Sequence, residues 1–412
     1  MKFRKILVPF VSVFLLSLAI AVSCSFFLEA TTLYSNANAS THNEQNSKPI
    51  VIGYSSWYGW WPWAIAEKEG LFEENGANVK LEWYDDYEES MKAFAAGELD
   101  GNCQTLNDTI SFAGDAVNGE VVVLVNDNSA GNDKIIVSEE IETLEDLKGK
   151  TVALEEGLVD DFLLSLALQN NGISRDDVKI QNLKTAEAVK SFKAGTVDAV
   201  GVWSPFWLDA LDRQGSKELI SSREFPGAIP DLLVVSQTLI DERPEQVQAI
   251  VNTWFSILEF IEKNPKEAEE IMLIRSGIKD KNKFRKLKEG TQFFSIEENL
   301  EAFSTGNTMK HMPFAAKEMT QFMLDVKFIE KAPDLNKIFN DKFVKNYAGS
   351  LSLFKDVSPT DNGFPALQNL VDNYGCIKGY PDGTFRGNDA ATRYEVVQMI
   401  GDCLDTFSSS SR

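Results

Sequence analysis

The sequence predicts an α/β fold built from two similar lobes, followed by a small helical unit at the C-terminal end. Three observations carry this prediction. Short apolar runs alternate with amphipathic stretches from Ile50 to Val235, which is typical of sheets covered by helices. One helix–turn–strand pattern occurs twice, at residues 91–101 and 189–199, which indicates two related lobes. Beyond Val235 the pattern indicates helices only.

The individual strands and helices follow from local patterns. The apolar run at residues 50–53 suits a strand buried on both faces, and Pro62 and Gly70 suit the start and the end of the next helix. Strands are expected at residues 50–53, 79–83, 101–103, 121–125, 135–137, 151–154, 178–182, 199–202 and 232–235. Helices are expected at residues 63–69, 87–95, 144–147, 161–170, 185–194, 206–213, 244–263, 265–275, 281–289, 296–303 and 313–326.

Composition divides the chain into four parts. Residues 1–24 are expected to be a signal peptide, because lysines and an arginine precede a long apolar stretch. Residues 25–48 are rich in Thr, Ser, Asn and Gln and are expected to form a flexible tether. Residues 49–346 hold the two lobes, the first at about 49–135 and 236–346 and the second at about 138–232. Residues 351–407 are the small C-terminal unit.

The end of the N-terminal apolar stretch, from Ile20 to Cys24, resembles a lipoprotein signal. That resemblance implies that Cys24 is lipidated after cleavage. Two alternatives stay open: cleavage without lipidation, and retention of the stretch as a membrane anchor, because its length approaches that of a membrane span. In each case we expect the protein to work outside the cytoplasm, in the periplasm or cell envelope.

The composition excludes several classes of function. The net charge of −22 argues against nucleic acid as a partner and is compatible with a cationic ligand. Because His42 and His311 are the only histidines, a histidine-based zinc site or a Ser-His-Asp triad is not expected. No glycine-rich phosphate or dinucleotide loop occurs, so neither a metal nor a cofactor is predicted. Cys376 and Cys403 bracket the C-terminal unit and can pair in an oxidising compartment.

A cluster of tryptophans is the strongest indication of a binding site. Four tryptophans occur at positions 57–63, between the first strand and the first helix, where open α/β sheets bind ligands. Acidic residues follow several later strands, and Trp203 ends the strand at 199–202. Carboxylates beside tryptophan faces describe a cation site, where a desolvated cation–π contact contributes about 2 kcal/mol. The predicted solute-binding residues are Trp57, Trp61, Asp108, Asp133, Glu155, Asp160 and Trp203.

Residues 51–346 resemble the solute-binding proteins of ABC importers, in the nitrate/sulfonate/taurine and thiamine-precursor branch. The resemblance is carried by Gly53-Tyr54 and by residues 64–72, 94–100, 144–152 and 197–203. It implies a type II periplasmic-binding-protein fold that encloses the solute between two lobes. It also implies crossover strands at residues 135–137 and 232–235, and the permease and ATPase subunits of an importer as partners.

Three further segments are similar to members of this branch that are encoded beside urea- or guanidine-carboxylase-type enzymes. They are residues 105–108, 131–136 and 155–160. This similarity, together with the acidic site, implies a small nitrogen-containing cation as the solute, with guanidine as the first candidate.

Residues 353–407 resemble an S-layer homology module of the form found in cyanobacterial outer-membrane porins. The matching stretches are 354–357, 366–371, 379–388 and 392–395, and they indicate a helix, a tight turn and a second helix. The resemblance implies binding to peptidoglycan or another cell-wall polymer through Arg386, Thr392, Arg393 and Glu395. The alternative is that both arginines only brace the fold.

Three other functions stay open at this point. A protein that binds nitrate, a sulfonate or taurine would need Arg, Lys or helix N-terminal amides in the cleft, whereas the expected cleft residues are acidic. An enzyme similar to those of thiamine-precursor synthesis would need a His, Cys or Lys group there, and we expect no catalysis because the cleft segments lack His. A purely structural envelope protein would not need the aromatic and acidic loops. We therefore predict a solute-binding protein that is anchored to the cell wall.

Overall fold

The computed structural model describes residues 48–357, 366–367, 370–371, 376–377, 379–380, 383–387 and 389–409. The expected signal peptide and the predicted lipidation of Cys24 lie outside these residues. All elements given below belong to one unit, Ile50–Arg412. None of the helices in the described part of the chain combines the length and the apolar character that crossing a membrane requires.

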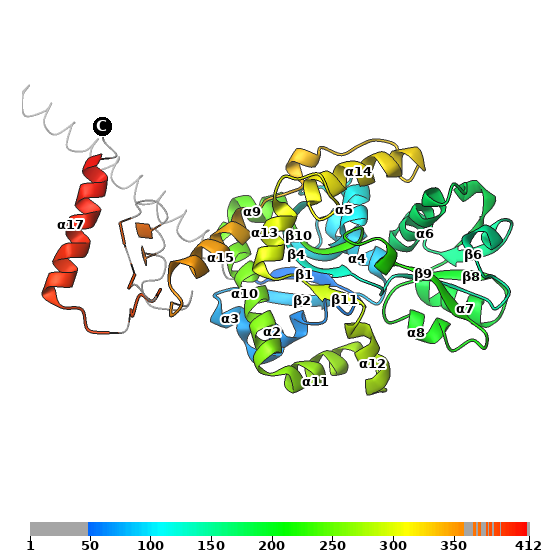
Figure 1. Ribbon diagram of the computed structural model, residues 1–412, viewed down its shortest axis with the longest axis horizontal. Coiled ribbons are helices and arrows are strands. Elements are labelled where there is room, and N and C mark those ends of the chain that lie inside the picture. Colours follow the sequence, from blue (N-terminus) through cyan, green and yellow to red (C-terminus); the bar gives the residue numbers. More distant parts are fainter. Residues whose placement is uncertain are drawn as a thin grey trace, which may run out of the picture. The chain divides into compact units, whose positions relative to one another are not determined.

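Two separate sheets form the centres of the two lobes (Figure 1). The first sheet has six strands in the order β11-β4-β10-β3-β1-β2, and the second has five in the order β7-β6-β8-β5-β9. The strands of the first sheet are β1 Ile50–Tyr54, β2 Val79–Trp83, β3 Gly101–Thr105, β4 Val121–Ser129, β10 Pro230–Val235 and β11 Thr291–Phe293. The strands of the second sheet are β5 Lys134–Val137, β6 Thr151–Leu154, β7 Lys179–Asn182, β8 Ala199–Val202 and β9 Lys217–Ser221. The two-lobed α/β fold expected from the sequence is confirmed.

Helices pack around each sheet (Figure 1). The first lobe holds α2 Trp63–Glu69, α3 Leu71–Glu74, α4 Tyr87–Ala95, α5 Leu106–Phe112, α9 Gln237–Glu242, α10 Pro244–Lys263, α11 Pro265–Ser276, α12 Lys281–Lys288, α13 Ile296–Phe303, α14 Met312–Asp325 and α15 Lys342–Leu353. The second lobe holds α6 Val159–Asn170, α7 Thr185–Lys193 and α8 Trp207–Ala210, and α17 Arg393–Ser409 belongs to the C-terminal module. Short 3-10 segments are η1 Leu144–Leu147, η2 Arg175–Asp177, η3 Ser222–Glu224 and η4 Leu335–Lys337.

The two lobes repeat one strand arrangement. In the first, β1 pairs in parallel with β2 and β3, and in the second, β6 pairs in parallel with β7 and β8. The repeated sequence pattern builds α4 followed by β3 in one lobe and α7 followed by β8 in the other. Gly97 and Gly195 stop these two helices with φ of 79° and 74°, a left-handed conformation that favours glycine. The internal repeat in the sequence is therefore a repeated structural unit.

The crossings between the lobes differ from the expectation. The expected crossover at residues 135–137 lies in β5, an interior strand of the second sheet, and residues 232–235 lie inside β10 of the first sheet. The chain crosses instead at residues 130–133 and 222–229, which connect β4 to β5 and β9 to β10. The sequence does not predict β9 and β11, because both are edge strands without a continuous apolar run.

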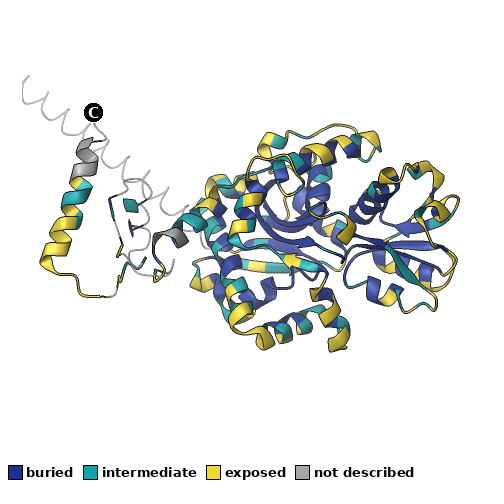
Figure 2. Cartoon of the chain, in the orientation of Figure 1, coloured by how far each residue is buried: buried dark blue, intermediate teal, exposed yellow. Residues whose placement is uncertain are grey.

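Burial follows the expected amphipathic patterns (Figure 2). The long helix α10 buries a face that contains Val247, Ile250, Trp254 and Ile257 at helical spacing. The last helix of the lobe, α15, packs against α10: Phe255 stacks on Tyr347 with ring centroids 4.3 Å apart. The chain that leads to the C-terminal module therefore leaves from the first lobe.

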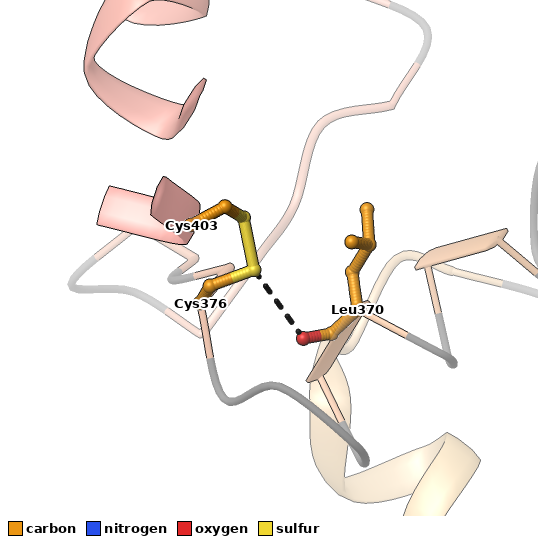
Figure 3. Close-up of a disulfide and its surroundings, with 3 residues drawn as sticks. All are labelled: Leu370, Cys376 and Cys403. Atoms are coloured by element: carbon orange, nitrogen blue, oxygen red, sulfur yellow. Dashed lines mark hydrogen bonds between the residues drawn. A yellow bond between two sulfur atoms is a disulfide. The ribbon is translucent and has the colours of Figure 1, made fainter. Parts of the chain in front are cut away.

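The C-terminal module is held by a disulfide and by main-chain contacts. Cys376 and Cys403, the pair that the sequence indicates, are joined with an S–S distance of 2.07 Å. Sγ of Cys376 lies 3.6 Å from the carbonyl oxygen of Leu370 (Figure 3). The Asp356 carboxylate accepts hydrogen bonds from the main-chain N–H groups of Phe385 and Arg386, each at 2.7 Å.

Candidate functional site

A small cavity lies between the two lobes beside the crossings. Its walls are formed by Trp57, Trp60, Tyr87, Thr105, Asp133, Val159, Trp203 and Asp231. Its volume is about 10 Å³, which is close to the space that one water molecule needs. The lobes meet around it, because the main-chain N–H of Tyr58 donates to Oγ of Ser204 at 3.3 Å. An ion pair between Lys184 and Asp86 also joins the lobes.

The turn after β1 determines which tryptophans face the cavity. The N–H of Trp60 donates to the carbonyl of Trp57 at 3.1 Å, so residues three apart in this turn lie on one side. Trp57 and Trp60 line the cavity. Trp61, which the sequence predicts in the site, lies instead in the core of the first lobe and stacks on Phe284 with centroids 5.9 Å apart. Trp60 therefore takes the place expected for Trp61.

Four aromatic rings form a chain around the cavity. Trp57 and Trp60 have ring centroids 6.3 Å apart, and Trp60 and Tyr87 have centroids 5.5 Å apart. Tyr87 also meets Trp203 of the second lobe edge-on at 5.9 Å. The faces of these rings are electron-rich, so the chain can receive a cation.

Asp108, another predicted site residue, lies behind Tyr87 and does not line the cavity. The Tyr87 hydroxyl donates to Oδ2 of Asp108 at 2.9 Å, and Thr105 Oγ1 donates to the same oxygen at 2.8 Å. Asn107 Nδ2 donates to the other oxygen at 2.8 Å. Burial raises the pKa of Asp108 to about 7 in spite of these hydrogen bonds. Asp108 therefore orients Tyr87 and does not face the cavity itself.

Three aspartates lie at the end of the first sheet, next to the crossings. Asp127, Asp231 and Asp133 are 0%, 1% and 2% exposed. Asp231 stands directly opposite Asp127 on the neighbouring strand, and Trp57 Nε1 donates to Oδ1 of Asp127 at 3.0 Å. Asp133 and Asp231 line the cavity, and Asp133 Oδ2 has no hydrogen-bond partner among the described residues. The site is thus rich in acceptors.

Burial changes the acidity of these carboxyl groups. It raises the pKa of Asp133 to about 7, and it raises the pKa values of Asp127 and Asp231 well above their usual range. No Lys or Arg is among the residues that line the cavity. Lys134, the basic residue next to Asp133, pairs instead with Glu218 and lies 4.9 Å from the centroid of the Trp207 ring.

The two predicted acids of the second lobe lie outside the cavity wall. Glu155 lines an adjoining groove together with Asp86 and Lys184, and its Oε1 accepts the N–H of Thr185 at 3.2 Å. Burial raises the pKa of Glu155 to about 7. Asp160 is fully buried at the start of α6, where its Oδ2 accepts the N–H of Glu155 at 3.3 Å. Glu155 therefore lies in a groove next to the cavity, and the Asp160 carboxylate holds its main chain.

Of the predicted site residues, the structure brings Trp57, Asp133 and Trp203 together. The cavity residues that the sequence did not predict are Trp60, Tyr87, Thr105, Val159 and Asp231. A signal for the unpredicted acids was present in the sequence. Polar residues extend the apolar strand β4 through Asp127 to Ser129, and Asp231 precedes the apolar run of β10. A buried strand that ends in polar residues at a crossing indicates a site.

The predicted wall-binding residues lie in the C-terminal module. The Arg386 guanidinium lies 4.2 Å from the centroid of the Tyr380 ring. Thr392 and Glu395 form two reciprocal hydrogen bonds, as in a capping box. The Thr392 N–H donates to Glu395 Oε2 at 2.7 Å, and the Glu395 N–H donates to Thr392 Oγ1 at 3.2 Å. Arg386 and Glu395 line one cavity of the module, whereas Arg393 is exposed and does not line it.

Comparison with known proteins finds binding proteins similar to the two-lobed part of the chain. The taurine-binding periplasmic protein of Escherichia coli is 27% identical over 197 residues, which are 47% of this chain and 60% of that protein. The structure of an alkanesulfonate-binding protein from Xanthomonas axonopodis pv. citri matches with a TM-score of 0.58 and 19% identity, over 71% of this chain and 98% of that one. The periplasmic nitrate-binding protein from Synechocystis PCC 6803 matches with a TM-score of 0.60 and 11% identity, over 78% and 97%.

At these identities the two structures establish a shared fold. The family is shown by a match to a family model. Residues 43–275, more than half of the chain, match the model of the NMT1-like family, and residues 353–397 match that of the S-layer homology domain. The three proteins named above are binding proteins for taurine, alkanesulfonates and nitrate. The chain belongs to the NMT1-like family and carries a C-terminal S-layer homology domain.

Proposed function

We propose that the protein is the solute-binding component of an ABC importer and captures a small nitrogen-containing cation between its lobes. Guanidine is the first candidate. The observation that carries this proposal is the cavity wall, in which Asp133 and Asp231 stand among aromatic rings and no Lys or Arg takes part. The partners of the protein would be the permease and ATPase subunits of the importer.

The energetics favour a cation in this site. A buried carboxylate without a counter-charge is unfavourable, and the raised pKa values of the aspartates express that cost. Micromolar affinity requires about 8 kcal/mol. One cation–π contact supplies only about 2 kcal/mol, and each hydrogen bond to a charged group supplies about 1.5–3 kcal/mol. Two carboxylates and two indole faces acting together reach the required sum.

The geometry favours a small planar solute. A guanidinium ion can direct its N–H edges at Asp133 and Asp231 while its faces meet the rings of Trp57 and Trp203. The cavity has a volume of only about 10 Å³, so it must widen to admit guanidinium, and a solute of few atoms requires the smallest change. The segments that resemble guanidine-associated proteins supply Thr105 and Asp133 to the wall, so the resemblance and the geometry support the same proposal.

An anion is the second candidate, and the names of the relatives favour it. Those relatives bind taurine, alkanesulfonates or nitrate. Trp60 lines the cavity, and its buried Nε1 has no acceptor among the described residues, so it could donate to an oxyanion. Such an anion would meet at least two carboxyl groups, so it would bind only while these groups are protonated. The two candidates therefore differ in their dependence on pH: a cation binds better as pH rises, and an anion binds better as pH falls.

A thermal-shift screen at about pH 8 and again at about pH 6, above and below the pKa of about 7 for Asp133, tests the proposal. The panel contains guanidinium, methylguanidine, urea, nitrate, taurine and methanesulfonate, at low millimolar concentrations that do not denature proteins. A ligand at 100 times its Kd adds about 2.7 kcal/mol to the free energy of unfolding, so guanidinium should raise the melting temperature by several degrees. Stabilisation by an oxyanion alone would reject a cation as the solute.

We also propose that the S-layer homology domain tethers the protein to peptidoglycan or another wall polymer. Arg386 would meet anionic groups of the glycan, with Thr392, Arg393 and Glu395 beside it. If Cys24 is lipidated, the lobes would be held between the membrane and the wall. Localisation in the cell envelope follows from this proposal.

Sedimentation with purified peptidoglycan tests the tether. Full-length protein should sediment with the polymer, and protein that lacks residues 351–412 should stay in solution. Arg386→Ala should weaken retention by roughly tenfold, because one charge-assisted contact contributes about 1.5–3 kcal/mol. Arg285→Ala is the matched control, since Arg285 is an exposed arginine of the first lobe that pairs with Glu269. Equal retention of the full-length and truncated proteins would reject the tether.

A further inference from the structure

We propose that Asp127 and Asp231 share one proton in the solute-free protein and release it when the cation enters, so that capture exchanges a solute for a proton. This inference rests on the proposed function. It assigns a role to Asp127, which lies next to the cavity without lining it.

The geometry of the two strands brings these carboxyl groups together. Asp127 on β4 and Asp231 on β10 are direct partners in the antiparallel register, so their side chains lie on the same face of the sheet. Thr105 on β3 is the next partner in the same row. Oδ2 of Asp127 and Oδ2 of Asp231 have no hydrogen-bond donor among the described residues, and the two carboxyl groups are within hydrogen-bonding reach of each other. A hydrogen bond between two carboxyl groups requires one proton.

The position of Asp127 is tightly fixed. Trp57 Nε1 donates to its Oδ1 at 3.0 Å, and a Cβ atom at Gly59 would lie 1.9 Å from its Oδ2. The carboxyl group is therefore held between Trp57, the backbone of Gly59 and Asp231. It cannot turn away from Asp231 to avoid a second negative charge.

The groups that face the pair add no positive charge. Asp133 and Asp108 interact with Asp231 from the segment after β4 and from α5, and both disfavour its ionisation. Cys103 of β3 and Tyr87 of α4 are buried neighbours whose own pKa values burial raises. Lys134 pairs with Glu218. Ionising both Asp127 and Asp231 would thus place two charges in a site without a counter-ion, and one retained proton avoids this cost.

The pKa directions agree with a shared proton. Burial raises the pKa of both groups, and the hydrogen bond between them then lowers the pKa of Asp127 and raises that of Asp231. When a cation enters, the O–H bond of the protonated carboxyl breaks and the proton passes to the solvent. The N–H donors of the cation replace it, so the charge of the site does not change. Affinity for the cation should therefore rise with pH, by at most about tenfold per pH unit for each released proton.

Calorimetric titration with guanidinium, in buffers that differ in their enthalpy of ionisation, counts the released protons. The measurement uses the full chain at about pH 7, near the pKa of Asp133. Asp127→Asn keeps the shape of the pair, and its amide N–H can donate to Asp231 in place of the shared proton. We expect this variant to release about one proton fewer per bound solute than the wild type.

Glu120→Gln is the matched control. Glu120 is a buried acid of the first lobe that accepts a hydrogen bond from Gln104, and it does not line the cavity. Its removal should leave the proton count unchanged. If guanidinium binds and the wild type and Asp127→Asn release equal numbers of protons, the shared proton is rejected while the proposed function stands. If no cation in the panel binds and an oxyanion does, the proposed function itself fails.

The wild-type protein gives a second readout that needs no variant. Its Kd for guanidinium should fall as pH rises from about 5 to 8. A Kd that stays constant over this range would reject proton release even if Asp127→Asn does not fold.

Discussion

Asp133→Asn is expected to weaken the binding of guanidinium by roughly 100-fold at about pH 8. The substitution keeps the size of the side chain and removes its charge. Asp133 is 2% exposed and lines the cavity, and its Oδ2 has no partner among the described residues. The amide would also direct an N–H group at the N–H donors of the solute. The loss should appear as an increase in Kd measured by calorimetric titration.

Asp108→Asn is the matched comparison, because Asp108 is equally buried and has a pKa raised to about 7. It acts on the cavity indirectly, through its hydrogen bonds with Tyr87 and Thr105, so its loss should change Kd by roughly tenfold or less. Asp176→Asn, at an exposed residue of η2 in the second lobe, should change nothing. An Asp133→Asn protein that melts like the wild type and binds guanidinium equally well would exclude Asp133 from the site.

Gly59→Ala should both destabilise the protein and weaken binding. The new Cβ atom would lie 1.9 Å from Oδ2 and 2.2 Å from Cγ of Asp127, far inside contact distance. Because Asp127 is held by Trp57, the strain can be relieved only by breaking that hydrogen bond or by moving the tryptophan turn. Overpacking of this kind costs about 1–3 kcal/mol of stability. Thermal unfolding and solute titration both measure the effect.

Gly114→Ala is the control for this substitution. A Cβ atom at Gly114 meets nothing within 4 Å, and neither glycine has a positive φ. The two variants therefore add the same methyl group and differ only in the available space. If Gly59→Ala behaves like Gly114→Ala in both assays, Asp127 is not confined as the structure indicates.

The elements of the fold could be predicted because they depend on local patterns. Residues 151–154, a threonine followed by three apolar residues, form β6 with the predicted bounds, and Pro244 starts α10 as expected. The crossings could not be predicted in the same way. An apolar run such as residues 135–137 indicates a buried strand, but it does not say to which sheet the strand belongs.

The types of residue in the candidate site could be predicted from the sequence, but not every position. The sequence indicates a tryptophan turn and acids after the strands, and Trp57, Asp133 and Trp203 do meet at the cavity. The choice between Trp60 and Trp61 depends on the rotation of a single turn, which no periodic pattern sets. Asp127 and Asp231 belong to strands that are distant in sequence and become neighbours only through the register of β4 and β10.

The packing of α15 on α10 has a consequence for how the molecule moves. Phe255 and Tyr347 stack, and Gln248 Nε2 donates to the carbonyl of Phe343 at 3.0 Å, so the last helix before the C-terminal module is part of the first lobe. Any pull on that module reaches the first lobe directly and reaches the second lobe through the two crossings and through contacts between the lobes such as Tyr58–Ser204 and Lys184–Asp86. In a protein held by its C-terminal end, the first lobe would therefore stay in place. Opening and closing would be a movement of the second lobe relative to the first.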